Sequence, residues 1–204
     1  MGYYPLMMDL TGRRCLVVGG GEVARRKVAS LVEAGGLVTV IAPEIDSAIV
    51  DMPSVRVEIR AWRPGEIAGY VLVFAATDDR MLNTAVSEEA RANGIPVNVV
   101  DDPELCSFIV PACVRRQDFL IAVTTSGKSP TLSKKIRREI EARYGREYGE
   151  FVALLGEVRA LVKEKYSEAK DREAVFGRLM DCGILELLST GNIEEARKKA
   201  LECI

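Results

Sequence analysis

Hydrophobic and polar positions in the N-terminal half of the chain alternate between two spacings. Short unbroken apolar runs, typical of buried parallel strands, are separated by stretches in which apolar residues recur every three to four positions, as on one face of a helix. The helical spacing follows the first run directly and returns between residues 81 and 92. Strands are predicted at 15–18, 37–41, 55–59, 71–75 and 97–100, of which 15–18 and 71–75 are wholly apolar. Strands that alternate with helices predict an α/β fold with a parallel sheet covered by helices on both faces.

After the fifth predicted strand this alternation ends. Two further short strands are predicted at 107–110 and 119–123, with the charged residues 115–118 as the turn between them. Ser129 and Pro130 then have the residue types favoured at a helix N-cap and at the first helical position. From residue 147 onward the apolar spacing is helical. The expected parts are a sheet domain over 1–112, a strand-helix segment over 113–145 and a small all-α C-terminal domain over 146–204.

Composition and charge exclude several kinds of chemistry. The chain has 204 residues with a net charge of −2, so no bulk positive field favours nucleic acid or an anionic membrane as partner. It has no histidine, which excludes His-based catalytic triads and zincin-type sites. The five cysteines form no Cys-x-x-Cys pair, so we expect no disulfide framework and no metal site, and a reducing cytoplasm fits best. No apolar run approaches the roughly 20 residues needed to cross a bilayer.

A glycine turn follows the first predicted strand. Residues 19–24, GGGEVA, fit the pattern Gly-x-Gly-x-x-Ala between a strand and a helix. In dinucleotide-binding folds of the Rossmann type the first glycine allows the tight turn, the second lets the backbone approach a pyrophosphate, and the helix N-terminus faces the phosphates. The alternative is a glycine turn that only allows close packing. The setting favours a Rossmann-type domain that binds a dinucleotide.

The acidic residue that usually binds the adenosine ribose is missing from its expected place. Dinucleotide folds put it at the end of the second strand, where this chain has Ala42. Glu44 follows two positions later and could serve instead. No arginine follows the strand to bind a 2′-phosphate, so NAD is favoured over NADP.

Two adjacent carboxylates follow the fifth predicted strand. Asp101 and Asp102 would lie at the carboxyl edge of the sheet, where open α/β sheets bind their ligands. A carboxylate in that place could accept or donate a proton during a reaction. Asp-Asp-Pro is also an ordinary turn sequence, and both interpretations stay open.

A basic segment crosses the middle of the chain. Between residues 112 and 138 there are seven basic residues and a single acidic one, Asp118. This asymmetry indicates a polyanion site, to which residues 124–129 would add hydroxyls and a helix N-terminus. The alternative is a solvated helix face. Nucleic acid is disfavoured because only one aromatic residue, Phe119, lies in the segment.

Five blocks of the sequence occur in the order and spacing of one family. They are residues 15–27, 75–79, 98–101, 107–111 and 126–130. Together they resemble precorrin-2 dehydrogenase, the dehydrogenase part of siroheme synthase, and the helical tail is similar with weaker motifs. The resemblance implies NAD-dependent oxidation of precorrin-2 to sirohydrochlorin by a homodimer, a step in siroheme biosynthesis. Some members also insert iron, so an additional ferrochelatase activity stays open.

The same resemblance assigns roles to individual residues. The catalytic aspartate falls on Asp101, and no residue is assigned to metal. Cofactor contacts would fall on Gly19, Gly21, Glu22, Val23, Pro43, Glu44, Thr77 and Asp78. The carboxylate side chains of the tetrapyrrole give the basic segment a partner, with Thr125, Ser126, Lys128, Ser129, Lys134 and Arg138 as the expected substrate-binding residues. Segment 113–145 would then serve both dimerisation and tetrapyrrole binding.

Two other classes of protein share the strand, glycine turn and helix. One is an NAD-binding regulatory module without catalysis, and the other is a methyltransferase that binds S-adenosylmethionine. Both usually keep the ribose-binding acid that Ala42 replaces here. The regulatory module also gives no reason for Asp101 together with the basic segment.

Overall fold

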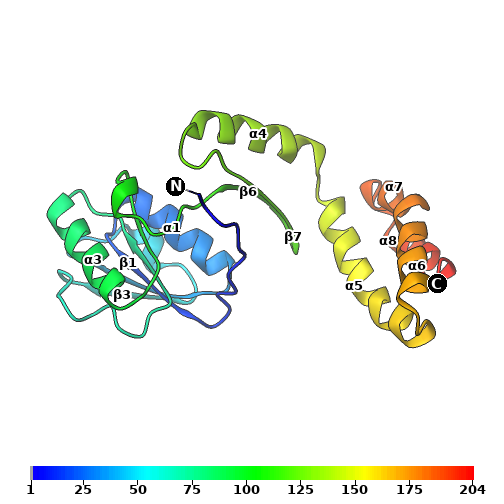
Figure 1. Ribbon diagram of the computed structural model, residues 1–204, viewed down its shortest axis with the longest axis horizontal. Coiled ribbons are helices and arrows are strands. Elements are labelled where there is room, and N and C mark those ends of the chain that lie inside the picture. The colour runs from blue at the N-terminus through cyan, green and yellow to red at the C-terminus, as the bar shows by residue number, and fades with distance from the viewer. Residues whose placement is uncertain (1) are drawn as a thin grey trace. The chain divides into compact units, whose positions relative to one another are not determined.

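Tertiary contacts divide the chain into two units, one ending at Val110 and the other spanning Pro111–Ile204. The structure is a computed structural model and describes residues 2–204 (Figure 1). The N-terminal unit contains one five-stranded sheet, and the C-terminal unit contains a two-stranded sheet and several helices. Each unit is described by itself below.

The sheet of the N-terminal unit is parallel throughout, with the strand order β3-β2-β1-β4-β5. Its strands are β1 (Arg14–Val18), β2 (Leu37–Ala42), β3 (Val55–Ile59), β4 (Leu72–Ala75) and β5 (Val97–Val99). Its helices are α1 (Glu22–Glu33), the short α2 (Ser47–Val50), α3 (Arg80–Ala92) and the 3-10 turn η1 (Pro103–Leu105). The strand order reverses beside β1, because the chain adds β2 and β3 on one side and β4 and β5 on the other. Such a reversal opens the crevice in which parallel α/β sheets bind ligands.

Alternate residues of the central strand serve two separate cores. Cys15 and Val17 belong to the cluster that also holds Val28 of α1, whereas Leu16 and Val18 belong to the cluster that holds Val86 of α3. All four β1 side chains are 0–1% exposed. Since successive strand residues point to opposite faces, this division places the two helices on opposite faces of the sheet. The predicted Rossmann-type parallel sheet covered on both faces is confirmed.

The C-terminal unit begins with an antiparallel hairpin and continues as helices. The hairpin strands are β6 (Ala112–Arg116) and β7 (Phe119–Val123). The helices are α4 (Pro130–Arg143), α5 (Glu147–Lys165), α6 (Ala169–Asp181), α7 (Ile184–Ser189) and α8 (Ile193–Glu202). Apolar residues of the last four helices form one core, in which Val162, Leu179 and Ala196 are fully buried. None of the helices within residues 2–204 combines the length and apolar character needed to cross a membrane.

The strand predicted at 107–110 is wrong. This segment is an irregular loop, held to β5 by the hydrogen bond from Asn98 Nδ2 to the Phe108 carbonyl at 3.1 Å. The Phe108 ring packs edge-on against Phe74, with 5.6 Å between ring centroids. Its apolar residues therefore cover one face of the sheet and do not pair with another strand.

The hairpin turn is also shorter than predicted. Arg115 and Arg116, expected in the turn, belong to β6 and pair with β7. Gln117 and Asp118 alone connect the strands, with Gln117 in the left-handed region at φ 52°. In β6 only Val114 is buried, so the charged residues stay accessible on a strand that pairs on one side.

We expect Asp79→Ala to lower the free energy of unfolding of the N-terminal unit by about 1 kcal/mol. Asp79 is the N-cap of α3, and its Oδ1 accepts hydrogen bonds from the amides of Met81 (2.8 Å) and Leu82 (3.2 Å). Denaturant unfolding of both proteins measures the difference. Asp78→Ala is the matched control, because Asp78 is exposed and caps no helix. Equal losses in the two variants would contradict the capping role.

Candidate active site

The glycine turn is fixed by backbone contacts on two sides and open on a third. Gly19 has φ +121°, and a Cβ there would lie 2.2 Å from the Ala76 carbonyl oxygen after β4. A Cβ on Gly20 would lie 2.1 Å from the Glu44 carbonyl oxygen, in the loop after β2. At Gly21 a Cβ would meet nothing within 4 Å. Gly21 is thus the position at which another molecule can approach the backbone.

The open side of the turn coincides with the start of α1. Gly21 is the N-cap and offers no side chain to the first-turn amides, and the Arg25 amide is bonded back to the Gly21 carbonyl at 2.9 Å. The first amides of a helix have no acceptor within the helix, and they carry the positive end of its dipole. Glu22 and Val23, predicted as cofactor contacts, supply two of these amides. Bare glycine backbone and free amides together fit a pyrophosphate.

The loop after β2 contains an ion pair that the sequence did not reveal. Ala42 is buried, whereas Pro43 and Glu44 are exposed. Beyond them, Asp46 Oδ2 lies 3.6 Å from Nε of Arg25, which reaches the loop from α1. An arginine therefore stands at the end of the second strand after all, although it comes from the preceding helix. The argument for NAD from a missing arginine is corrected by this contact.

The turn after β4 is held by a buried amide. Asn83 of α3 is 5% exposed, and its Oδ1 lies 2.7 Å from the Thr77 hydroxyl, which donates to it. Its Nδ2 donates to the Thr77 carbonyl at 2.8 Å. Asn83 thereby fixes Thr77, while the neighbouring Asp78 is exposed. Asn83 was not predicted, because a single asparagine in a helical stretch has no distinguishing spacing.

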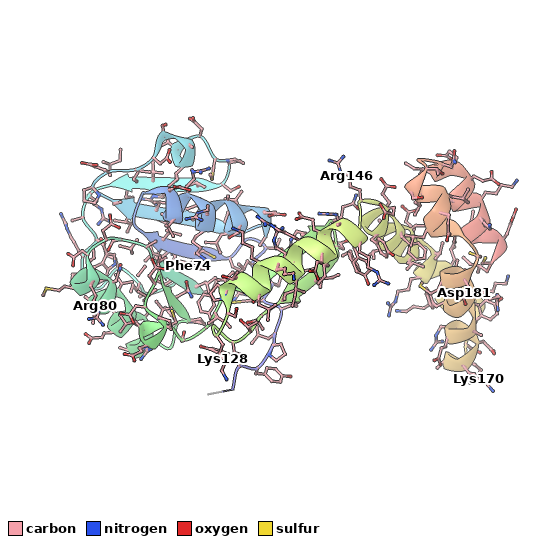
Figure 2. All side chains as sticks on the ribbon, turned by 90° about the horizontal axis from the view of Figure 1, so that it is seen from above. Phe74, Arg80, Lys128, Arg146, Lys170 and Asp181 are labelled. Carbon is pink, nitrogen blue, oxygen red and sulfur yellow. The ribbon has the colours of Figure 1, made fainter. Side chains whose placement is uncertain are left out.

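The two adjacent aspartates at the end of β5 differ in their surroundings. Asp102 Oδ2 accepts a hydrogen bond from Arg80 Nε at 3.2 Å, and its side chain is 17% exposed. Figure 2 shows Arg80 at the start of α3. Asp101 is exposed and adopts the left-handed conformation, with φ 59°. Within residues 2–204 its carboxylate forms no hydrogen bond or ion pair, so it stays accessible to a ligand.

Cys106 fixes the turn that contains Asp101 and Asp102. Its Sγ accepts from the Val99 amide at 3.1 Å and contacts the carbonyl oxygens of Val99 (3.2 Å) and Asp102 (3.3 Å). Burial raises the pKa of the Cys106 thiol, so the thiol stays protonated and can donate to a carbonyl. The strained conformation of Asp101 is thus held by its neighbours, as is common at functional sites.

Lys27 of α1 brings a positive charge to the same turn. Its ammonium lies 5.6 Å from the centre of the Phe74 ring and interacts electrostatically with Asp101 and Cys106. Burial, more than the repulsion from Arg26, lowers the pKa of this ammonium below its ordinary value. Lys27 was not predicted as a site residue, because a single lysine in a helical stretch has no distinguishing spacing.

The predicted substrate-binding residues lie in the C-terminal unit, on the loop before α4 and on α4 itself. Thr125 Oγ1 accepts from the Ser129 amide at 2.9 Å, and Ser129 Oγ caps α4 by accepting from the Leu132 amide at 3.3 Å. Ser126 and Lys128 are exposed on the loop, where Figure 2 labels Lys128. The hydroxyls of Thr125 and Ser129 are thus already engaged in shaping the loop.

The four cations between residues 134 and 138 of α4 fall into two groups. Arg137 is paired with Glu141 at 2.7 Å and Lys135 with Glu139 at 4.0 Å, each one turn along the helix. Lys134 and Arg138 are exposed, and their side chains form no ion pair within residues 2–204. They stand four positions apart and share a helix face. Arg137 and Lys135 therefore fit the interpretation as a solvated helix face better than Lys134 and Arg138 do.

Metal-ligating residues do not gather in the part of the chain that is described. No group of three or more cysteine, aspartate and glutamate side chains there could hold a metal ion. Cys15, Cys106, Cys182 and Cys203 are free thiols.

Profiles of three families match consecutive parts of the chain. Residues 6–112 match one described as "Putative NAD(P)-binding". Residues 121–143 match "Sirohaem biosynthesis protein central", and residues 147–203 match "Sirohaem synthase dimerisation region".

Curated relatives and a solved structure agree with these matches. The chain is 39% identical over 205 residues to siroheme synthase of Methylococcus capsulatus, which covers 99% of this chain and 43% of the relative. It is 42% identical over 196 residues to siroheme synthase of Methylobacillus flagellatus, covering 95% and 42%. The chain thus spans less than half the length of these relatives. The solved structure of SirC, precorrin-2 dehydrogenase, is similar with a TM-score of 0.78 and 25% identity, over 98% of this chain and 100% of that one.

Substitutions in the glycine turn test its geometry. We expect Gly20→Ala to lower the free energy of unfolding by about 2 kcal/mol or more, because its methyl group would collide with the Glu44 backbone. Gly21→Ala should change it by less than about 0.5 kcal/mol, since Gly21 has φ −83° and open space around it. Denaturant unfolding of the two variants measures this contrast. Gly21→Ala should nevertheless weaken dinucleotide binding, and undiminished binding would contradict an approach at this residue.

Proposed function

Since the chain belongs to the siroheme synthase family and spans its NAD(P)-binding, central and dimerisation regions, we propose that it is an NAD-dependent precorrin-2 dehydrogenase. The single observation that carries the proposal is the set of groups found at the carboxyl edge of the parallel sheet. There an open glycine turn and the accessible carboxylate of Asp101 belong to one compact unit. The reaction removes a hydride and a proton from precorrin-2 and forms sirohydrochlorin.

The glycine turn would hold the cofactor. Gly19 keeps the turn tight, and Gly21 with the amides of Glu22 and Val23 would bind the pyrophosphate. Pro43 and Glu44 are exposed after β2 on the adenosine side, and Thr77 and Asp78 follow β4 on the nicotinamide side. Bound NAD supplies the hydride acceptor.

Asp101 would take the proton. A carboxylate oxygen of Asp101 accepts the proton lost from the substrate carbon, and the left-handed backbone held by Cys106 keeps that carboxylate at the sheet edge. Asp102 cannot serve equally, because Arg80 already binds its carboxylate. The half-buried ammonium of Lys27 interacts electrostatically with Asp101 and so places a positive charge beside the proposed proton acceptor.

The C-terminal unit would supply the substrate contacts. Precorrin-2 carries several carboxylates, which need cations and polar hydrogens as partners. Lys128, Lys134 and Arg138 are exposed cations without an ion pair inside residues 2–204. Ser126 adds an exposed hydroxyl, and Thr125 and Ser129 shape the loop that carries it. The match of residues 147–203 to a dimerisation region supports a homodimer as the working form. A reducing cytoplasm is the proposed compartment, because it fits five cysteines without a Cys-x-x-Cys pair.

An anaerobic assay with precorrin-2 and NAD tests the proposal directly. Formation of sirohydrochlorin, followed by its absorbance, is the expected result. Addition of Fe²⁺ after oxidation is complete then shows whether the same chain also inserts iron. A folded protein that binds NAD but does not oxidise precorrin-2 would overturn the proposal in favour of an NAD-binding regulatory module.

We expect Asp101→Asn to lower turnover by about 10²-fold or more, because the amide cannot accept the proton. Binding of NAD, measured by equilibrium titration, should remain within a few-fold of the original. Asp102→Asn is the matched control, since it removes the adjacent carboxylate that Arg80 occupies, and it should keep most of the activity. An Asp101→Asn protein with full turnover would remove the assigned role.

Charge reversal on α4 tests the substrate contacts. Lys134→Glu and Arg138→Glu should each weaken binding of the tetrapyrrole by about tenfold, because a carboxylate would face the carboxylates of the substrate. NAD affinity should stay unchanged. Lys135→Glu is the comparison variant, because Lys135 is a neighbouring exposed cation already paired with Glu139. If all three variants weaken tetrapyrrole binding equally, the two unpaired cations have no special role.

A further inference from the structure

The loop after β2 is positioned by the glycine turn. The Asp46 amide donates to the Gly20 carbonyl at 2.9 Å, and the Glu44 carbonyl lies against Gly20 so closely that a Cβ there would be 2.1 Å away. Two backbone contacts therefore fix the path of residues 44–46 relative to the turn that would bind the pyrophosphate. Whatever side chains this loop carries are held at the adenosine end of the dinucleotide site.

Asp46 has both carboxylate oxygens engaged. Its Oδ1 accepts from the Ala48 amide at 2.9 Å and caps α2. Its Oδ2 lies 3.6 Å from Nε of Arg25, with side-chain exposures of 36% for Asp46 and 39% for Arg25. The first contact fixes the carboxylate, and the second draws the guanidinium of α1 to the loop. Asp46 thus neutralises the arginine that α1 brings to the loop after the second strand. Arg60 also lies at this strand end, where its amide donates to the Ala42 carbonyl at 3.0 Å, but its guanidinium is bound by Glu58 and Glu66.

The two nicotinamide dinucleotides differ in the group that would face the Arg25–Asp46 ion pair. NAD has a free ribose diol, which a carboxylate binds by accepting hydrogen bonds, whereas NADP has a 2′-phosphate, which an arginine binds and a carboxylate repels. The chain holds both groups at one place. Ala42, where the ribose-binding acid is usual, is buried and cannot contribute.

We propose that the Arg25–Asp46 ion pair determines the choice between NAD and NADP. Asp46 excludes the 2′-phosphate by its charge and by occupying Arg25, and Arg25 is a phosphate ligand that becomes available when the carboxylate is removed. This inference rests on the proposed use of a dinucleotide and identifies the residues that select it.

The substitution Asp46→Asn isolates the charge. Asparagine is as good an N-cap as aspartate, so its side-chain oxygen can keep the hydrogen bond from the Ala48 amide. Only the attraction for Arg25 and the repulsion of phosphate are lost. Asp51→Asn is the matched control, because it removes one exposed negative charge at the other end of α2.

The experiment measures the dissociation constants of NADH and NADPH by fluorescence titration of the full chain. We expect Asp46→Asn to tighten NADPH binding by at least about tenfold relative to NADH, because a charge-assisted contact forms with the phosphate. The double variant Asp46→Asn with Arg25→Met should lose this gain. Asp46→Asn with Arg26→Met should retain it, because Arg26 is the adjacent exposed arginine of α1. Asp51→Asn should leave the ratio unchanged.

The outcomes separate this inference from the proposed function. A ratio of NADPH to NADH affinity that Asp46→Asn leaves within twofold would overturn the role of the pair while NADH binding still supports a dinucleotide enzyme. A gain that survives Arg25→Met would also overturn it, since the phosphate would then have another partner. Failure of the folded original chain to bind either dinucleotide would overturn both proposals. Circular dichroism of each variant establishes that it is folded.

Discussion

Direct contact between backbones at the glycine turn is the constraint on which the N-terminal unit depends. Gly19 lies against Ala76 after β4, and Gly20 lies against Glu44 after β2. No side chain fits in either place, so the backbone segments that follow three neighbouring strands are in direct contact at the turn. That contact closes the turn on two sides and leaves Gly21 and the start of α1 open on the third. The open side of the turn, where we propose that the dinucleotide binds, is therefore a consequence of this packing.

Some charged side chains around the glycine turn fix loops or cap helices, whereas others have no such structural contact. Asp46 and Asp102 are bound by arginines, Asp46 and Asp79 also cap helices, and each of them fixes a loop. Asp101, Lys27, Glu44 and Asp78 have no ion pair within residues 2–204, and among them Lys27 is half-buried and Asp101 adopts the left-handed conformation. Holding a lysine half-buried or an aspartate in the left-handed region costs free energy, which a purely structural role would not require. Their joint presence supports the role that we propose for Asp101.

The fold was largely predictable because burial and periodicity coincide in a parallel sheet. The strand at 55–59 was predicted with its observed limits, and the other four of this sheet differ by one residue at an end. The wrong strand prediction at 107–110 has a physical cause. Phe108 is apolar because it packs against Phe74 on the face of the sheet, and its segment does not pair with a neighbouring strand. The opposite error at Arg115 and Arg116 arose because a two-stranded hairpin can keep charged residues on its open face. The pattern of apolar residues indicates which residues are buried, but it does not indicate which segments pair as strands.

Site residues were predictable only where the chain order itself brings them together. The glycine turn and the α4 cap are local, so spacing alone revealed them. Arg25 and Asp46 are separated by β2 and meet because Gly20 fixes the returning loop, a fact that no local pattern contains. The same holds for Lys27 beside Asp101 and for Asn83 beneath Thr77. In each case the missed residue is a polar side chain on a helix that reaches a loop at the carboxyl edge of the sheet. Since the backbone of that edge is fixed by glycine contacts, these helical side chains are the part of the site that can vary, and selectivity toward a cofactor or a substrate is expected to reside in them.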